Sequence, residues 1–364
     1  MDFSFTEDQD TLRELTRKIL GDLATPERIG AIEKSEEWFD RKLWAELGKA
    51  NLLGVGLSET QGGSGWGFFE VCLLLHEQGR AVAPLPMHGT LVAALAIARF
   101  GSDAQRERWL PGVAAGDVVF GVALQDEGGD DLRRPVVRAT SGEDAVRLTG
   151  VKIHAESVAW ADRILVTATD DAGQTGAYLV DPRGDGVSLE RQQGTHYAPV
   201  WWVTLEGAPA EPLAGADVGW IADRAVAGLC AIQLGVSERA LEMTSSYGRE
   251  REQFDRPIGS FQAFHQRAGD AYVQTEAIRL SVWQAASRLD REEDPGDAVP
   301  VAKFWSAEGG QFVGYAAQHL HGGIGVDVDY PLHRYYMLAK HLELSLGSAN
   351  RALAHLGAAA ALDN

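Results

Sequence analysis

The chain has 364 residues, 45% of them apolar, so it is long enough to form two or three domains with substantial cores. Its formal net charge of -19 argues against a nucleic-acid partner, because phosphates would be repelled over most of the surface. An anionic ligand would therefore need a local cluster of basic residues.

Neither a secretory leader nor a membrane segment is predicted. The first residues lack a basic region followed by an apolar one, and no apolar run approaches the length that spans a bilayer. Only Cys72 and Cys230 are present, and their positions suggest neither a disulfide framework nor a metal site. We therefore expect a cytoplasmic protein with no membrane or nucleic-acid partner.

Residues 1–117 have the apolar periodicity of α-helices. A glycine-rich segment at 59–67 interrupts it. Since no strand precedes this segment and no lysine follows it, we interpret it as a loop between helices rather than a phosphate-binding loop. The predicted helices cover 12–23, 38–47, 68–77 and 91–100.

The pattern changes at Val118, where short runs rich in apolar and β-branched residues begin. Clusters of Gly, Asp and Pro separate these runs, which continue to about Leu213. The runs are VVFGVAL, AVRLTGVKI, RILVTAT, AYLVD and WWVTLEG. This pattern predicts a small antiparallel β-barrel domain over residues 118–214.

Helical periodicity returns after the predicted β domain and continues through residues 215–364. Long helices are predicted at 221–247, 261–291, 298–320 and 330–356. The chain is therefore predicted to have an α+β fold, in which an N-terminal all-helical domain, a middle antiparallel β domain and a C-terminal four-helix bundle follow one another.

Two of the predicted helices meet at a corner, residues 247–266. Pro257 and Gly259 mark the turn, and Ser260 is the predicted N-cap of the next helix. The corner has guanidinium groups beside aromatic rings, which suits a ligand with a phosphate and an aromatic group, but also a solvated helical hairpin with an aromatic core. These residues are Arg249, Arg251, Arg256, Arg267, Phe254, Phe261 and Phe264.

Three motifs carry a family resemblance: REQFDRPIGSFQ at 251–262, HLHGGIG at 319–325 and YPLHRYY at 330–336. Together with the helix, sheet, helix order they resemble the acyl-CoA dehydrogenase family over nearly the whole chain. The resemblance implies an FAD cofactor bound between two subunits and a glutamate that removes the α-proton of an acyl-CoA. It also implies hydride transfer from the β-carbon to the flavin, and an electron-transfer acceptor.

The resemblance also implies which residues contact an FAD held mainly by a neighbouring subunit. In the family, the corner and the Gly-Gly segment reach the pyrophosphate and the adenosine across the interface. The glutamine usual three residues before the Gly-Gly pair is replaced here by His319, which can still donate a hydrogen bond. The implied cofactor-binding residues are Arg251, Phe254, Gln262, His319, Gly322 and Gly323.

The sequence lacks a glutamate at the position where the resemblance places the family's catalytic base. Leu346 stands where most members have a glutamate before glycine, and leucine cannot take a proton. The family's alternative base position corresponds to Ala225. Its nearest carboxylate, Asp223, is two residues away on a helix and so points about 200° away.

Glu343 is the second weak candidate for a base. It lies three residues before Leu346, so an unbroken helix would place both side chains on nearly the same face. It can equally be a surface carboxylate near Lys340 and His341.

The predicted β domain lacks the family's flavin-binding signatures. Residues 124–131 read LQDEGGDD and residues 154–157 read HAES, in place of the family's neutral hydrogen-bond donors. Carboxylates at these positions would repel a diphosphate. They are Glu127, Asp130, Asp131 and Glu156.

The departures from the family pattern are selective. The corner residues that would contact a neighbour's cofactor are kept, whereas the catalytic glutamate and the flavin-binding residues of the β domain are not. The chain therefore resembles the non-catalytic subunit of actinobacterial heteromeric (α2β2) acyl-CoA dehydrogenases that shorten sterol side chains. In that arrangement FAD is shared across the interface, the acyl-CoA binds in the site of the catalytic partner, and the isolated chain is inactive. A self-sufficient dehydrogenase with a relocated base, Glu343 or Asp223, and a flavin-free scaffold both stay open.

Overall fold

The computed structural model describes residues 4–142 and 145–362, and the chain divides into two compact units. The helical unit comprises Met1–Ile29, Cys72–Ala83 and Ala227–Asn364. The sheet unit comprises Gly30–Val71 and Pro84–Val226. Helices α4 and α7 each supply residues to both units, because the divisions fall inside them.

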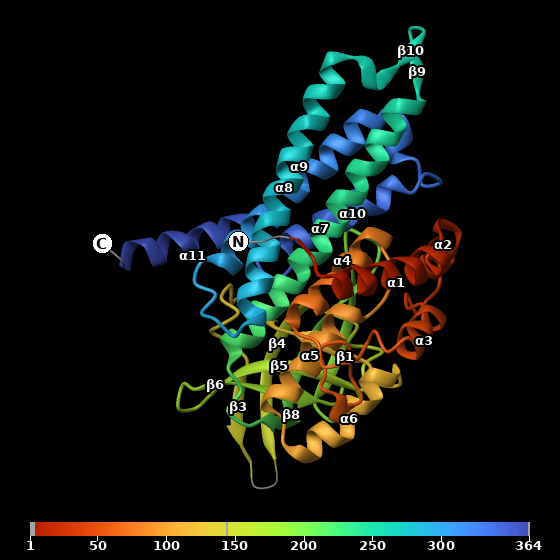
Figure 1. The fold of residues 1–364 in the computed structure, drawn as a ribbon. Coiled ribbons are helices and arrows are strands. Elements are labelled where there is room, and N and C mark those ends of the chain that lie inside the picture. Colours follow the sequence, from red (N-terminus) through yellow and green to blue (C-terminus); the bar gives the residue numbers. More distant parts are fainter. Residues whose placement is uncertain (1–3, 143–144, 363–364) are drawn as a thin grey trace. The chain divides into compact units, whose positions relative to one another are not determined.

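The helical unit is built around helices α7 to α10, with α11 packed on α9. Short 3₁₀ segments, η2 and η3, and a two-stranded hairpin connect these helices (Figure 1). The elements are α1 Glu7–Leu23, α4 Phe68–Ala81, α7 Val218–Glu250, β9 Glu252–Gln253, β10 Arg256–Pro257, η2 Ile258–Ser260, α8 Gln262–Asp290, α9 Ala298–His321, η3 Gly322–Val326, α10 Leu332–Leu344 and α11 Ala349–Leu362. Helix α2, Pro26–Glu33, crosses a unit division.

Two glycines let α4 and α7 pack with their backbones in contact. A Cβ at Gly79 would lie 2.1 Å from the carbonyl oxygen of Ile232, and a Cβ at Gly235 would lie 2.0 Å from that of His76. Neither position has room for a side chain, so the close approach of the two helices depends on both glycines.

A buried ion-pair network lies beside this contact. His76 Nε2 is 2.9 Å from Glu238 Oε2 and its Nδ1 is 3.3 Å from Glu77 Oε1. Arg80 donates to Glu238 at 2.9 Å, and Arg17 donates to both oxygens of Glu77 at 2.8 and 3.0 Å. Burial alone would lower the pKa of His76, but its contacts with the two carboxylates raise it above its usual range.

The sheet unit contains an eight-stranded sheet whose pairings close a ring through β1, β4, β8, β6 and β5. Most pairings are antiparallel; β1–β5 and β3–β5 are parallel. Apolar residues alternate inward along the strands, and Leu148, Val166 and Val203 are fully buried in the core. The strands are β1 Phe120–Ala123, β2 Gln125–Asp126, β3 Arg138–Ser141, β4 Val146–Glu156, β5 Arg163–Asp170, β6 Thr175–Val180, β7 Val187–Gln193 and β8 Pro199–Leu213.

Helices of the N-terminal half complete the sheet unit. They are α3 Arg41–Lys49, α5 Met87–Phe100 and α6 Asp103–Ala115, with the 3₁₀ turn η1 Glu59–Gln61. Helix α5 is buried over most of its length and packs on β1, where the Phe120 N–H donates to Thr90 Oγ1 at 3.1 Å. The capping box of Ser102 and Gln105 fixes the start of α6.

The predicted α+β fold is confirmed, and two local predictions are wrong. The expected helix over 330–356 is broken between α10 and α11, where Leu346 has a φ of 53°. Ser260 is not an N-cap, because its hydroxyl donates to the Pro257 carbonyl and α8 begins at Gln262 without a side-chain cap. The predicted domain limits after residues 117 and 214 fall in the connections α6–β1 and β8–α7, and remain predictions.

Within 4–142 and 145–362, no helix is both long and apolar enough to cross a bilayer. In the same residues, no three His, Cys, Asp or Glu side chains are grouped so that they could hold a metal ion.

Candidate functional site

The corner between α7 and α8 is a short hairpin with an exposed aromatic tip. Strands β9 and β10 pair Gln253 with Arg256, and the two residues between them, Phe254 and Asp255, have φ values of 55° and 60°. This is the backbone of a two-residue hairpin turn, although glycine and asparagine are its usual residues. Phe254 is 87% exposed at the tip, which lies at the far end of α7 and α8 (Figure 1).

The base of the hairpin is closely packed because two glycines permit close contacts. A Cβ at Gly248 would lie 2.4 Å from the ring of Phe264, and a Cβ at Gly259 would lie 2.7 Å from the carbonyl oxygen of Gly248. The Ile258 N–H donates to the carbonyl of Arg251 at 2.8 Å, which closes the turn. The tip is therefore held outward by a fixed support.

The four corner arginines differ in what they contact. Arg249 donates to the hydroxyls of Ser245 and Ser246, Arg256 lies over the ring of Phe261, and Arg267 lies over that of Phe312. Arg251 is exposed, and its guanidinium has no partner among the residues that the structure describes. Arg256 is exposed too, and its contact with Phe261 uses no N–H group, so the donors of both Arg251 and Arg256 remain available to a ligand.

Aromatic stacking connects the end of α7 to the glycine segment η3. The ring of Tyr247 stacks on His321 at 4.5 Å between centroids, and His321 directly precedes Gly322. His321 Nδ1 contacts the Ala317 carbonyl at 2.8 Å, so the neutral ring accepts from the Tyr330 hydroxyl at Nε2, 3.2 Å away. Burial lowers the pKa of His321, which favours this neutral form.

The predicted cofactor-binding residues have the exposure and the open space that the diphosphate and adenosine of FAD require. A Cβ at Gly322 or Gly323 would meet nothing within 4 Å, so packing inside this chain does not require either glycine. At Gly322 the backbone itself favours glycine, because its φ is 64°. His319 and Gln262 are exposed, as Arg251 and Phe254 are. Donors, an aromatic face and open backbone on one unit are what such a nucleotide needs, and the residues fit it.

Leu346, at the predicted position of the catalytic base, lies in a turn whose carbonyl oxygens bind a buried lysine. Lys303 Nζ donates to the carbonyl oxygens of Leu342 at 2.8 Å and Ser345 at 2.7 Å. Burial lowers the pKa of Lys303 to about 8. The left-handed backbone of Leu346 costs about 1–2 kcal/mol in a non-glycine residue, yet the turn is held in place.

Both candidate bases have basic partners. Glu343 accepts from Lys340 at 2.9 and 3.0 Å. The prediction that it shares a helix face with Leu346 is wrong, because α10 ends at Leu344. Asp223 accepts from Arg133. Burial raises the pKa of this carboxyl, and Arg133 opposes that shift.

In the sheet unit, the segment at 124–131 is organised around an inward ion pair. Lys152 is fully buried, and its Nζ lies 2.9 Å from Asp126 Oδ1 and 3.1 Å from Thr167 Oγ1. Burial lowers the pKa of Lys152 to about 8, although Asp126 opposes this shift. Asp126 also accepts the N–H of Val137. Its carboxylate is thus committed to the interior of the ring of strands.

Tyr247 and His321 lie in the corner and in the glycine motif that the sequence identified, but their contact was not predicted, and Lys303 was not identified. The two stacked rings are far apart in the sequence and follow no spacing rule, so no sequence pattern could predict their contact. Lys303, by contrast, could have been recognised from the sequence, because it is a single charge within the otherwise apolar start of α9, AVPVAKFW. A buried lysine there needs several oxygen partners, and the end of α10 supplies them.

Comparisons with known proteins agree along the whole chain. The model "Acyl-CoA dehydrogenase, N-terminal domain" matches residues 6–117, and "Acyl-CoA dehydrogenase, C-terminal domain" matches residues 223–361. Acyl-CoA dehydrogenase FadE27 of Mycobacterium tuberculosis is 38% identical, over 98% of this chain and 98% of the relative.

Two solved structures are similar over nearly the full length. A variant of the Tcur3481–Tcur3483 steroid ACAD superposes with a TM-score of 0.95 at 44% identity, covering 98% of each chain. The ChsE4–ChsE5 complex from Mycobacterium tuberculosis contains a chain that superposes with a TM-score of 0.94 at 38% identity, covering 99% of each.

Proposed function

The chain belongs to the acyl-CoA dehydrogenase family, and from that premise we propose that it is the non-catalytic subunit of a heteromeric, FAD-dependent enzyme. Its partner supplies the catalytic glutamate and most of the acyl-CoA site. This chain supplies contacts to the partner's cofactor across the interface.

The observation that carries the proposal is the contrast between Phe254 and Leu346. Phe254 is 87% exposed at the tip of the hairpin, although one edge-to-face contact joins its ring to Phe261 at 6.2 Å between centroids. Leu346 retains a fixed turn at the position of the family's base, but it has no acid group. A surface for a neighbour is thus retained while the chain's own chemistry is lost.

Each residue of the corner has a task in the proposed site. The guanidinium of Arg251 offers paired donors to a diphosphate, and the ring of Phe254 offers an apolar face to the adenosine. Gln262 and His319 supply further hydrogen bonds, while Gly322 permits close backbone approach. When bound, FAD supplies the redox chemistry by accepting the substrate's β-hydrogen as hydride.

The substrate and the assembly follow from the relatives. One similar structure is described as a steroid ACAD, and another as a complex of two different chains. We extend the proposal to α,β-desaturation of a steroid side-chain CoA thioester by an α2β2 assembly, which passes its electrons to an electron-transfer acceptor. Cys72 and Cys230 are buried free thiols, in keeping with the proposed cytoplasmic location.

The test is to co-express the chain with a catalytic acyl-CoA dehydrogenase subunit and count flavins per purified assembly. We expect one flavin for every two chains, and a marked loss in Arg251→Ala. The matched control is Arg291→Ala, which removes another exposed arginine directly after the last residue of α8. Retention of full flavin by Arg251→Ala would favour a scaffold that does not contact the cofactor.

A second arm addresses the self-sufficient alternative. The chain purified alone should carry no stoichiometric flavin and reduce no dye with acyl-CoA substrates. In the assembly, Glu343→Gln should leave turnover unchanged, since that carboxylate is paired with Lys340. A yellow, active homomer would overturn the proposal.

A further inference from the structure

A pocket lies within the helical unit, away from the corner. Its volume is about 360 Å³, within the range of small-molecule sites, and it lies between α1, the start of α2, the end of α4, the middle of α7 and the start of α10. The α7 residues that line it, Arg239 and Met243, lie roughly 12–18 Å along the helix from Arg251 at 1.5 Å per residue. The part of the pocket on α7 is therefore separate from the corner that contains Arg251.

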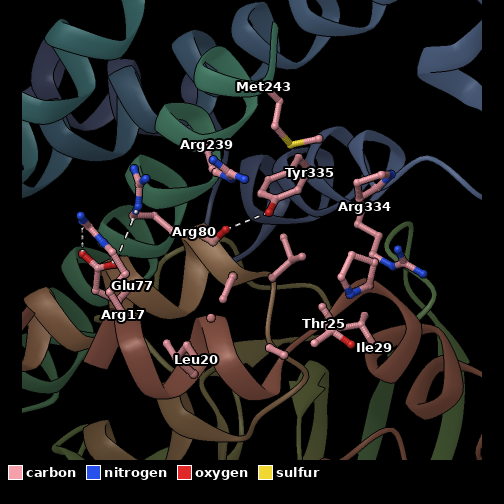
Figure 2. Close-up of a pocket in the computed structure, with 16 residues that line it drawn as sticks. Arg17, Leu20, Thr25, Ile29, Glu77, Arg80, Arg239, Met243, Arg334 and Tyr335 are labelled. Atoms are coloured by element: carbon pink, nitrogen blue, oxygen red, sulfur yellow. Dashed lines mark hydrogen bonds and ion pairs between the residues drawn. The ribbon is translucent and has the colours of Figure 1, made fainter. Parts of the chain in front are cut away.

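Four arginines from four helices line this pocket (Figure 2). Glu77 is the one carboxylate among its described lining residues, and its side chain is fully buried against Arg17. A chain with a net charge of -19 thus has a local excess of guanidinium groups here. The arginines are Arg17, Arg80, Arg239 and Arg334.

The ion pairs within the protein do not use all the donors of these arginines. Arg80 is committed, since it binds Glu238 at 2.9 Å and Glu242 at 2.8 Å. Arg17 uses Nε and Nη2 on Glu77 and is half-exposed, which leaves both N–H groups of Nη1. Arg239 gives Nη1 to Glu242 at 3.1 Å, with its side chain 47% exposed.

The remaining wall is apolar. Figure 2 shows Met243 and Tyr335 on one side of the pocket, with Leu20 and Ile29 on the other. The Tyr335 hydroxyl donates to the Arg80 carbonyl at 2.8 Å, which fixes the ring as part of the wall. Methionine adapts to irregular apolar ligands. A ligand here would therefore need an apolar body as well as an anionic group.

The chemistry of the wall favours a carboxylate over a phosphate. Phosphate sites commonly present several backbone amides from a glycine-rich loop. Gly21 is the one glycine among the described lining residues, and it lies inside α1, where its amide faces along the helix. The anion-binding groups are thus the planar forks of arginine side chains, which match a carboxylate or a phosphate in two-point contact. The preference for a carboxylate comes from the small number of backbone amides in the wall.

We propose that this pocket binds an organic carboxylate with an aliphatic body, its anionic end among the arginines and its body against Leu20, Ile29 and Met243. The proposal does not depend on the flavin contacts of the corner.

The test is isothermal titration calorimetry of the full chain with decanoate. Saturable binding is expected, with no binding of decanol and none of inorganic phosphate. Arg239→Gln should weaken decanoate binding about tenfold, the effect of one charge-assisted hydrogen bond. Met243→Trp, which fills the pocket without changing its charge, should abolish binding.

The matched control is Arg291→Gln, because Arg291 is also half-exposed and has one acidic partner, Glu293, at 3.3 Å. It should bind decanoate as the unmodified chain does. The proposal is overturned if decanoate does not bind, if decanol binds equally well, or if both arginine variants behave alike. Unchanged binding by Met243→Trp would place the ligand elsewhere and overturn it too.

Discussion

The Nζ of Lys303 lies 2.7 Å from the carbonyl oxygen of Ser345, the residue before Leu346. A buried amine in α9 thus holds the backbone of the turn that the sequence motifs predict to be the family's base position. The side chain at this position, a leucine, can take no proton. Four predictions follow from this contact and from the packing of α4 against α7.

Replacing Lys303 with methionine should destabilise the protein by about 1–3 kcal/mol at neutral pH, because buried carbonyls at the end of α10 lose their donor. Urea unfolding measures the change. Lys340→Met is the matched control: its ammonium pairs with Glu343 in a more exposed position, so the loss should stay below about 1 kcal/mol. Equal losses in the two variants would contradict the capping role.

The destabilisation by Lys303→Met should grow as the pH is raised from 8 to about 10.5. Burial lowers the pKa of Lys303 to about 8 in the folded protein, below its value in the unfolded chain. Between these values the unfolded chain binds more protons, so the lysine's contribution to stability increases with pH, by up to about 1.4 kcal/mol per pH unit. Unfolding titrations at several pH values test this. A constant difference between variant and parent would argue against a buried charged amine.

Acid should remove a stabilising contribution between about pH 4.5 and pH 2. Burial would raise the pKa of Glu77 and Glu238, but His76 and nearby arginines bind their charged forms and lower each pKa to about 2. A carboxylate with a lowered folded pKa stabilises above its unfolded pKa, and the effect is lost as pH falls through the folded value.

The His76 contribution has the opposite sign. Its raised pKa gives stability that is present below about pH 6.5 and lost as pH rises through the folded value. Glu238→Gln should therefore flatten the pH dependence of unfolding on both sides. Exposed Glu293→Gln serves as the control, and similar profiles for the two variants would refute the prediction.

Gly79→Ala should destabilise the protein by more than 2 kcal/mol, since its Cβ would lie 2.1 Å from the Ile232 carbonyl oxygen and the two helices would have to separate. Gly21→Ala is the control. It is also helical, but a Cβ there meets nothing within 4 Å, so about 0.5–1 kcal/mol of stabilisation is expected. Thermal unfolding distinguishes these opposite signs.

The sequence predicted what depends on local pattern. Apolar periodicity located most of the helices, and the change of pattern at Val118 located the start of the sheet. Local pattern could not show that Leu346 has a positive φ, because leucine is a poor residue for that backbone. The single long helix predicted there was wrong for this reason.

Features that need distant residues were also beyond the sequence. The guanidinium groups of the pocket come from four helices and share no spacing. The stacked rings of Tyr247 and His321 likewise come from distant parts of the sequence. Phe254 and Arg251, by contrast, lie in one continuous motif, and their placement at an exposed corner could be expected.

If the proposed partner subunit covers the exposed phenyl ring at position 254, this ring distinguishes the unassembled chain from the assembled one. Chaperones and proteases that recognise exposed aromatic side chains could then bind a subunit that has not yet bound its partner. A surplus of this polypeptide would then be cleared, and the cell could balance the two gene products without matching their rates of synthesis.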